Sequence, residues 1–270
     1  MMGEQAIATN LLSAIIHSLT SMGLEDGTKI IALVINNPIV MQVFQAQFKA
    51  KYYWIIMLPC LLYEINTTIG EITSFPTIKR VIAKCNKLVT FFNSSHYWGG
   101  QLSIEAANDR NDSIFTDKSI SIPLGQLCLC SDAQHWQHGL SAVPNDIITT
   151  VLNDSEFWSQ LGQLIKVTKP IVDAIGNLES CEANLADRML KLIYCTCKII
   201  QISFDADEDD HDFWIHAKKV FNRRFYSMNT PIHSLALFLH PLTQHFAISQ
   251  VASSCSMQFL SKTALEVALK

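Results

Sequence analysis

Two short apolar runs near the N-terminus set the strongest limit on the fold of this 270-residue chain. The first, 30–34, ends at the turn sequence Asn36-Asn37-Pro38, and helical spacing of apolar residues follows from Val40 to Phe48. The second, 52–58, stops at Pro59, which cannot donate a hydrogen bond to a sheet ladder. The pattern predicts strand, helix, strand. Because two strands cannot make a full sheet, their edges must be covered by helices or by a partner chain.

Helical spacing dominates the remainder, so we expect a mixed α/β fold that is mostly α, with two short strands plus helices at the start. A good helix N-cap at Asp154 or Ser155 begins a helix that Lys169-Pro170 is expected to kink or break. Gly, Asn, Asp, Ser and Pro accumulate in the middle of the chain. We therefore predict an α/β element at 1–98, an irregular linker segment at 99–147 and a helical region at 148–270.

Composition limits the classes of protein to which the chain belongs. It is 49% hydrophobic and carries a net charge of −4, so a nucleic acid would have to bind a local basic patch. Eight cysteines without a secretory signal are typical of free thiols in a reducing compartment. The longest apolar run contains a proline and is too short to span a bilayer. These features predict an intracellular protein with no membrane partner. The nucleotide-binding and hydrolase motifs are absent, so no small-molecule substrate is predicted.

One predicted helix carries a basic face that is a candidate for DNA binding. Lys218, Lys219, Arg223 and Arg224 are interleaved with aromatic residues, and positions four apart share a helix face. Such a face could meet a phosphate backbone. A solvated surface over an apolar one is the alternative interpretation.

Metal and thiol chemistry have weak signals. Cys128, Cys130, His135 and His138 are zinc-ligand types, but their spacing is tighter than in zinc fingers, and chance occurrence in a loop is the alternative. Cys60 is a possible nucleophile for which the sequence identifies no base. The acidic run 205–212 lacks the glycine and glutamate that a calcium loop needs, which favours a solvated loop that caps the next helix.

Five stretches, in order and spanning most of residues 24–245, resemble the transposases of the hAT superfamily, and most closely its fungal branch of ribonuclease H-like proteins. They are KIIALVINNPIVMQVF, KYYWIIMLPCLLYEINTTIGEI, LVTFFNSSHYWGGQL, FWSQLGQLIKVTKPIVDAIGNLES and HSLALFLHPL. The resemblance implies that 1–98 is a partial ribonuclease H-like core and that 148–270 is a helical insertion-type region. Intact members hold three carboxylates that bind two divalent metals, such as Mg²⁺, for DNA strand transfer.

The resemblance also implies that the catalytic set is missing. Asn36 stands where the family carries its second aspartate, and a neutral amide contributes no charge to a metal site. Tyr63 replaces a histidine of the family pattern, and the family's Cys-Glu-x-Arg-Trp-like segment is not found. The alternative interpretation is that Asn36 is a turn residue that did not replace a catalytic aspartate. The remaining residues that match the family motifs are Asn37, Cys60, Asn66 and Trp158.

The resemblance therefore implies a catalytically inactive, transposase-derived protein that retains association with DNA or protein. We expect no catalytic residue, no bound metal and no cofactor, with DNA and a second copy of the chain as candidate partners. A nuclear location follows from the resemblance alone. A decayed transposon copy with no selected function and a repurposed metal- or thiol-dependent enzyme are the alternatives.

Overall fold

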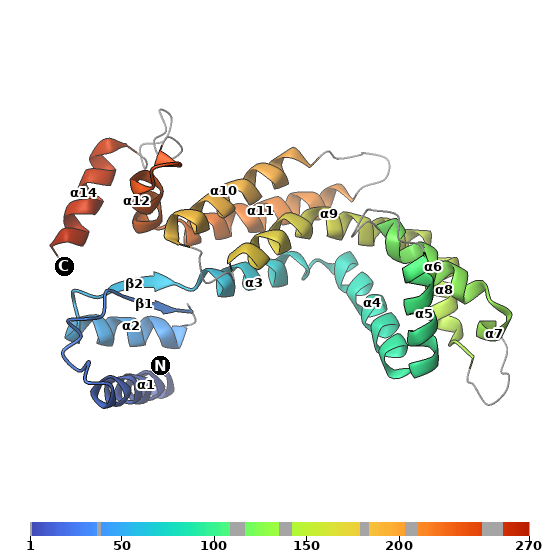
Figure 1. Cartoon of the computed structure of the whole chain (residues 1–270), viewed down its shortest axis with the longest axis horizontal. Helices are drawn as coiled ribbons and strands as arrows, with labels where there is room; N and C mark the ends of the chain where they lie inside the picture. The colour runs from blue at the N-terminus through green and yellow to red at the C-terminus, as the bar shows by residue number, and fades with distance from the viewer. Residues whose placement is uncertain are drawn as a thin grey trace. The chain divides into compact units, whose positions relative to one another are not determined.

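The computed structural model describes residues 2–36, 39–108, 117–134, 142–178, 184–202, 210–244 and 256–269, and these are mostly helical (Figure 1). The strands are β1 (Ala32–Ile35) and β2 (Ile56–Pro59). The helices of the first half are α1 (Met2–Ser21), α2 (Ile39–Lys51), α3 (Leu61–Ile72), α4 (Pro76–Ser94), α5 (His96–Asn108), α6 (Asp117–Leu129) and α7 (Ser131–Gln134). Those of the second half are α8 (Asn145–Leu152), α9 (Ser155–Leu178), α10 (Leu185–Gln201), α11 (His211–Met228), α12 (Pro231–Leu239) and α14 (Met257–Ala268).

The strands form one parallel pair, in which Ala32 lies opposite Ile56 and Ile35 opposite Pro59. Parallel neighbours need a crossover connection, and α2 supplies it. Figure 1 shows α2 beside the two strands, with α1 on the far side of α2. The predicted mixed α/β, mostly α class is confirmed at this level. Both strands begin and end later than the apolar runs indicate, at 32–35 and 56–59.

Aromatic side chains fill the core of this N-terminal element. Phe44, Phe48 and Tyr52 are buried one helical turn apart, with ring centroids 5.5 and 4.9 Å from their neighbours. The phenol of Tyr52 donates to the backbone oxygen of Glu25 at 2.9 Å. Gly27 has a φ of 66°, and a Cβ there would lie 2.9 Å from the Tyr52 ring. The turn before β1 is therefore fixed both by backbone conformation and by contact with Tyr52.

The chain divides into two compact units, and the second lies within the sequence of the first. The first unit comprises Met1–Thr68, Ile171–Cys197 and Val220–Lys270, and the second comprises Ile69–Pro170 and Lys198–Lys219.

The second unit has its own apolar core, built from α4, α5, α6, α8 and the start of α9. Ion pairs join α4 to the other side of this core, from Lys84 to Asp154 and from Lys87 to Asp146. The buried members of the core are Val81, Leu88, Phe92, Trp98, Leu124, Leu127, Cys128, Ala133, Val143, Ile147, Val151 and Phe157.

Residues 99–147 are the main departure from the expected fold. In place of an irregular segment, their described parts form most of α5, all of α6 and α7, and the start of α8. Gly99, which in the sequence indicates a break, lies inside α5, where a Cβ would come 2.4 Å from the backbone oxygen of Phe92. The glycine is needed for the close approach of α5 to the end of α4, so packing overrides its low helix propensity.

Helix α9 also runs further than the sequence indicates. It begins after the predicted cap, since Asp154 Oδ1 accepts a hydrogen bond from the Phe157 amide at 2.9 Å. It then continues through Pro170 to Leu178, so Lys169-Pro170 does not break the helix.

Candidate functional site

The carboxyl ends of the two parallel strands are the first candidate site, because ligands in open α/β sheets bind at that edge. Asn36 follows β1 and is exposed, while Cys60 follows β2. The amide of Cys60 donates to the backbone oxygen of Ile35 at 2.7 Å, which places Asn36 and Cys60 after neighbouring strand ends. Asn37 lies outside the described residues. The edge thus carries an amide and a thiol where a metal site would need carboxylates.

A carboxylate that the sequence analysis did not single out lies one helical turn beyond Cys60. Glu64, on α3, is only 3% exposed, and its Oε2 lies 3.2 Å from a guanidinium nitrogen of Arg224 on α11. A buried carboxylate needs a partner of opposite charge, and Arg224 supplies it. Arg224 therefore forms an ion pair inside the first unit, although the sequence placed it on the basic face. The signal that could have found Glu64 is its place between apolar residues on one face of α3.

The other residues of the family pattern on α3 point elsewhere. Tyr63 is 38% exposed and Asn66 is exposed, so the two adjoin Glu64 in sequence but do not share its buried face. Trp158 lies on α9, half-buried, and its indole nitrogen donates to the backbone oxygen of Val151 at 3.0 Å. Trp158 belongs to the second compact unit, whereas Asn36 and Cys60 belong to the first.

The predicted basic face lies on α11, where its four members differ in environment. Lys219 and Arg223 are exposed, and Tyr226 beside them is 77% exposed. Lys218 is half-buried, with its ammonium 4.7 Å from the centroid of the Trp214 ring, a cation–π geometry. The exposed part of the face is thus the stripe Lys219, Arg223 and Tyr226.

The predicted zinc ligands divide between described and undescribed residues. Cys128 is fully buried in the core of the second unit, and burial raises the pKa of its thiol to about 11. Cys130 is exposed, with its sulfur 3.4 Å from the backbone oxygen of Gln126. His135 and His138 lie outside the described residues. Within the described ranges no three His, Cys, Asp or Glu side chains are grouped closely enough to hold a metal ion.

The acidic run ends in a helix cap, as the sequence indicated. Asp210 precedes α11, and its Oδ1 accepts a hydrogen bond from the Phe213 amide at 3.0 Å. Its backbone amide donates to Gln163 at 3.0 Å, which ties the start of α11 to α9 within the second unit. Residues 203–209 lie outside the described ranges.

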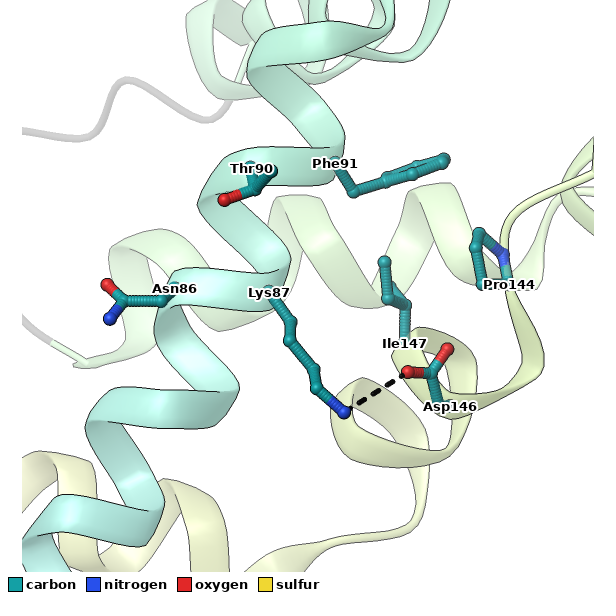
Figure 2. Close-up of a pocket in the computed structure, with 7 residues that line it drawn as sticks. All are labelled: Asn86, Lys87, Thr90, Phe91, Pro144, Asp146 and Ile147. Atoms are coloured by element: carbon teal, nitrogen blue, oxygen red, sulfur yellow. Dashed lines mark ion pairs between the residues drawn. The ribbon is translucent and has the colours of Figure 1, made fainter.

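A surface depression of about 450 Å³ lies between α4 and the start of α8 (Figure 2). Lys87 points across it toward Asp146, 3.7 Å away, and both side chains are more than half exposed. Phe91 and Ile147 supply apolar surface beside the ion pair. The depression contains neither a nucleophile with a base nor a set of metal ligands, so its chemistry is that of a solvated surface.

In the part of the chain that the structure describes, no helix is both long and apolar enough to cross a membrane. Comparisons with protein family models, with curated proteins and with solved structures find no match to this chain.

Proposed function

We propose that this chain is a transposase-derived protein with a partial ribonuclease H-like core, that it lacks strand-transfer chemistry, and that it associates with DNA through α11. The observation that carries the proposal is Asn36, which follows β1 of the parallel pair at the edge where the resembling family carries a carboxylate. An amide oxygen binds Mg²⁺ weakly and adds no negative charge.

The nearby carboxylate does not supply what Asn36 lacks. Two-metal catalysis needs charged oxygens directed at the ions. Glu64 is buried and directed at Arg224 instead. Its carboxylate therefore acts within the first unit as the partner of a cation, which supports a protein without this catalysis.

The exposed stripe on α11 supports association with DNA. Lys219 and Arg223 are four residues apart, so both cations lie on one side of the helix and can contact neighbouring phosphates. Tyr226 adds an exposed aromatic ring, which can stack on a base of a single strand or an opened duplex. A nuclear location is part of the same proposal.

The test of DNA association is fluorescence anisotropy with a labelled DNA duplex over a series of salt concentrations. We expect the affinity to fall with salt, and Lys219→Ala with Arg223→Ala to reduce the slope of log K against log salt by about 2, one for each lost phosphate contact. Arg224 is left intact because its removal would unpair Glu64.

The matched control removes the same two charges elsewhere. Lys49 and Lys262 are exposed, on α2 and α14, so Lys49→Ala with Lys262→Ala is expected to leave the slope unchanged. Equal effects of the two double variants would overturn the role of α11. Absence of salt-dependent binding would overturn DNA association, and the decayed copy without selected function would then be favoured.

The loss of catalysis is tested separately, by incubating the protein with labelled DNA and Mg²⁺ or Mn²⁺. We expect no strand cleavage or joining above the level of a metal-only control. Cleavage that EDTA abolishes and that copurifies with the folded chain would contradict the proposal.

A further inference from the structure

An apolar cavity opens into the core of the second unit. It has a volume of about 310 Å³ and is lined by residues of α4, α5, α6 and α9. Leu88, Phe92 and Phe157 form its buried walls, and Asn93 lies at its exposed rim. Val89, which also lines the pocket, is 57% exposed, so the pocket is open to solvent on one side. A concave and mostly apolar pocket of this kind is the usual form of a small-molecule site.

The side chains that line the cavity favour an uncharged ligand. No lining residue carries a charge, and Asn93 and Cys85 supply the side-chain polar atoms together with the indole of Trp158. The Trp158 nitrogen already donates to the backbone oxygen of Val151, so the ring offers the cavity its apolar surface. Burial raises the pKa of the Cys85 thiol, which keeps it uncharged at neutral pH. An ion would lose its hydration here without gaining a partner.

Solvent water reaches the open pocket, but the lining offers it few hydrogen-bond partners. An apolar ligand gains affinity when it displaces such poorly ordered water. The volume of about 310 Å³ is at the lower end of the range for small-molecule pockets, roughly 300–1,000 Å³. The volume and the uncharged lining together fit a compact small molecule.

We propose that this cavity binds a small, neutral, largely apolar molecule with one hydrogen-bonding group, which meets Asn93 at the rim. The ligand lies between α4 and α9 and packs on Leu88, Phe157 and the ring of Trp158. The site is independent of the DNA association proposed above, because it uses no residue of α11.

The test uses 1-naphthol as a neutral probe and 1-naphthalenesulfonate as its charged counterpart, each titrated into the full chain by isothermal calorimetry. We expect saturable one-to-one binding of 1-naphthol and binding of the sulfonate that is weaker by at least about tenfold, because the cavity offers an anion no partner. Lack of saturable binding, or equal binding of the two probes, would overturn the proposal.

Leu161→Trp is the cavity-filling variant, because Leu161 lines the cavity on α9. We expect it to weaken 1-naphthol binding by at least about tenfold, the order of effect that shape changes have in apolar pockets. The matched control is Leu129→Trp, since Leu129 is 65% exposed and does not line the cavity. Equal affinities of the two variants would contradict the assignment.

A second measurement does not depend on how the variant folds. We expect 1-naphthol to slow the alkylation of Cys85 by iodoacetamide in the wild-type chain, and to leave Cys130, which is exposed, unaffected as an internal reference. Unchanged alkylation of Cys85 would overturn the proposal. Sedimentation of the wild-type chain and of Leu161→Trp tests the remaining occupant, and a dimer lost in the variant would replace the ligand with a second copy.

Discussion

The two compact units differ in what they bury. Among the described residues, the first unit buries a carboxylate, an imidazole and several hydroxyls, whereas the second buries one polar side chain, Gln163. The polar groups of the first unit are Glu64, Thr68, His233, Ser234, Thr243 and Thr263. The ion pairs of the second unit lie nearer the surface, with Lys87 and Asp146 69% and 60% exposed.

This difference predicts which substitutions destabilise each unit most. A buried polar group is tolerated only with its partner, so removal of one member exposes the other to the full penalty of desolvation. An apolar core depends on shape and volume instead, and partly exposed charges at its edge contribute less than a buried pair. We therefore expect the loss of a charge to cost most in the first unit and less in the second.

The largest expected effect is that of Arg224→Met, which leaves Glu64 buried without a cation. We expect a loss of about 3 kcal/mol in the free energy of unfolding, the lower end of the range for breaking a buried pair. The lower end applies because 24% of the Arg224 side chain remains exposed. Urea denaturation followed by circular dichroism measures it.

The control for this variant is the double change Glu64→Leu with Arg224→Met. It removes both charges and replaces them with apolar groups, which is often neutral for stability. Recovery of most of the lost stability would attribute the effect to the unpaired carboxylate. If the double variant is as unstable as Arg224→Met, the loss does not come from an unpaired buried carboxylate, and the expected difference between the units is wrong.

Asp154→Ala is next in expected size and acts in the second unit. It removes the cap of α9 and the ion pair with Lys84, and we expect a loss of about 1–2 kcal/mol. The hydrogen bond from Lys84, together with that from the Phe157 amide, lowers the pKa of Asp154. This contribution is therefore present above the ordinary value of 3.8 and is lost as the pH falls below it.

Asp154→Asn separates the two roles of this side chain. The amide oxygen can still accept from the Phe157 backbone, while the charge opposite Lys84 is lost. We expect Asp154→Asn to retain more stability than Asp154→Ala in thermal unfolding. Equal melting temperatures would show that the cap contributes little.

His233 is expected to make the stability of the first unit depend on pH. It is 1% exposed at the start of α12, with its Nδ1 2.6 Å from the hydroxyl of Thr230. Burial, and secondarily the charge of Arg188, lowers the pKa of this imidazole below its ordinary value of 6.5. The unfolded chain therefore binds the proton first, so this contribution is complete above pH 6.5 and is lost as the pH falls below it.

The expected slope is up to about 1.4 kcal/mol for each pH unit within that window. Urea denaturation at pH values between 5 and 7.5 is compared for the wild-type chain and His233→Gln, which does not titrate. If the free energy of unfolding depends on pH equally in the wild-type chain and in His233→Gln, His233 does not cause the loss of stability in acid.

The smallest expected effect is that of Lys87→Ala, in the depression between α4 and α8. An exposed ion pair contributes about 0–1 kcal/mol, and salt screens it further. We expect a change within the lower half of this range that disappears at high salt. A loss as large as that of Arg224→Met would erase the distinction between the units.

Local patterns account for the part of the fold that the sequence predicted. Helix α4 begins at Pro76, because proline suits the first helical turn, and its apolar residues recur at helical spacing up to Ser94. Pro59 is the last residue of strand β2, one position beyond the predicted run 52–58. Gly99 lies inside α5 because of its close approach to Phe92, which neighbouring residues in the sequence do not reveal. Pro123 likewise lies inside a helix, α6.

Less of the candidate sites than of the fold could be predicted from the sequence. The positions of Asn36 and Cys60 after two strands follow from short patterns and could be predicted. The pairing of Glu64 with Arg224 joins residues 160 positions apart, and no periodicity links them. The cavity brings together side chains of four helices, and each helix alone shows only an ordinary apolar face.

The nesting of the second unit within the first has a consequence for synthesis. Glu64 leaves the ribosome 160 residues before Arg224, a delay of about 8–32 s at typical rates of 5–20 residues per second. Throughout that interval the nascent first unit lacks the cation of its buried carboxylate, while the entire second unit up to Lys219 is being made. The growing chain therefore has a long period in which a chaperone or another early contact can decide whether it folds.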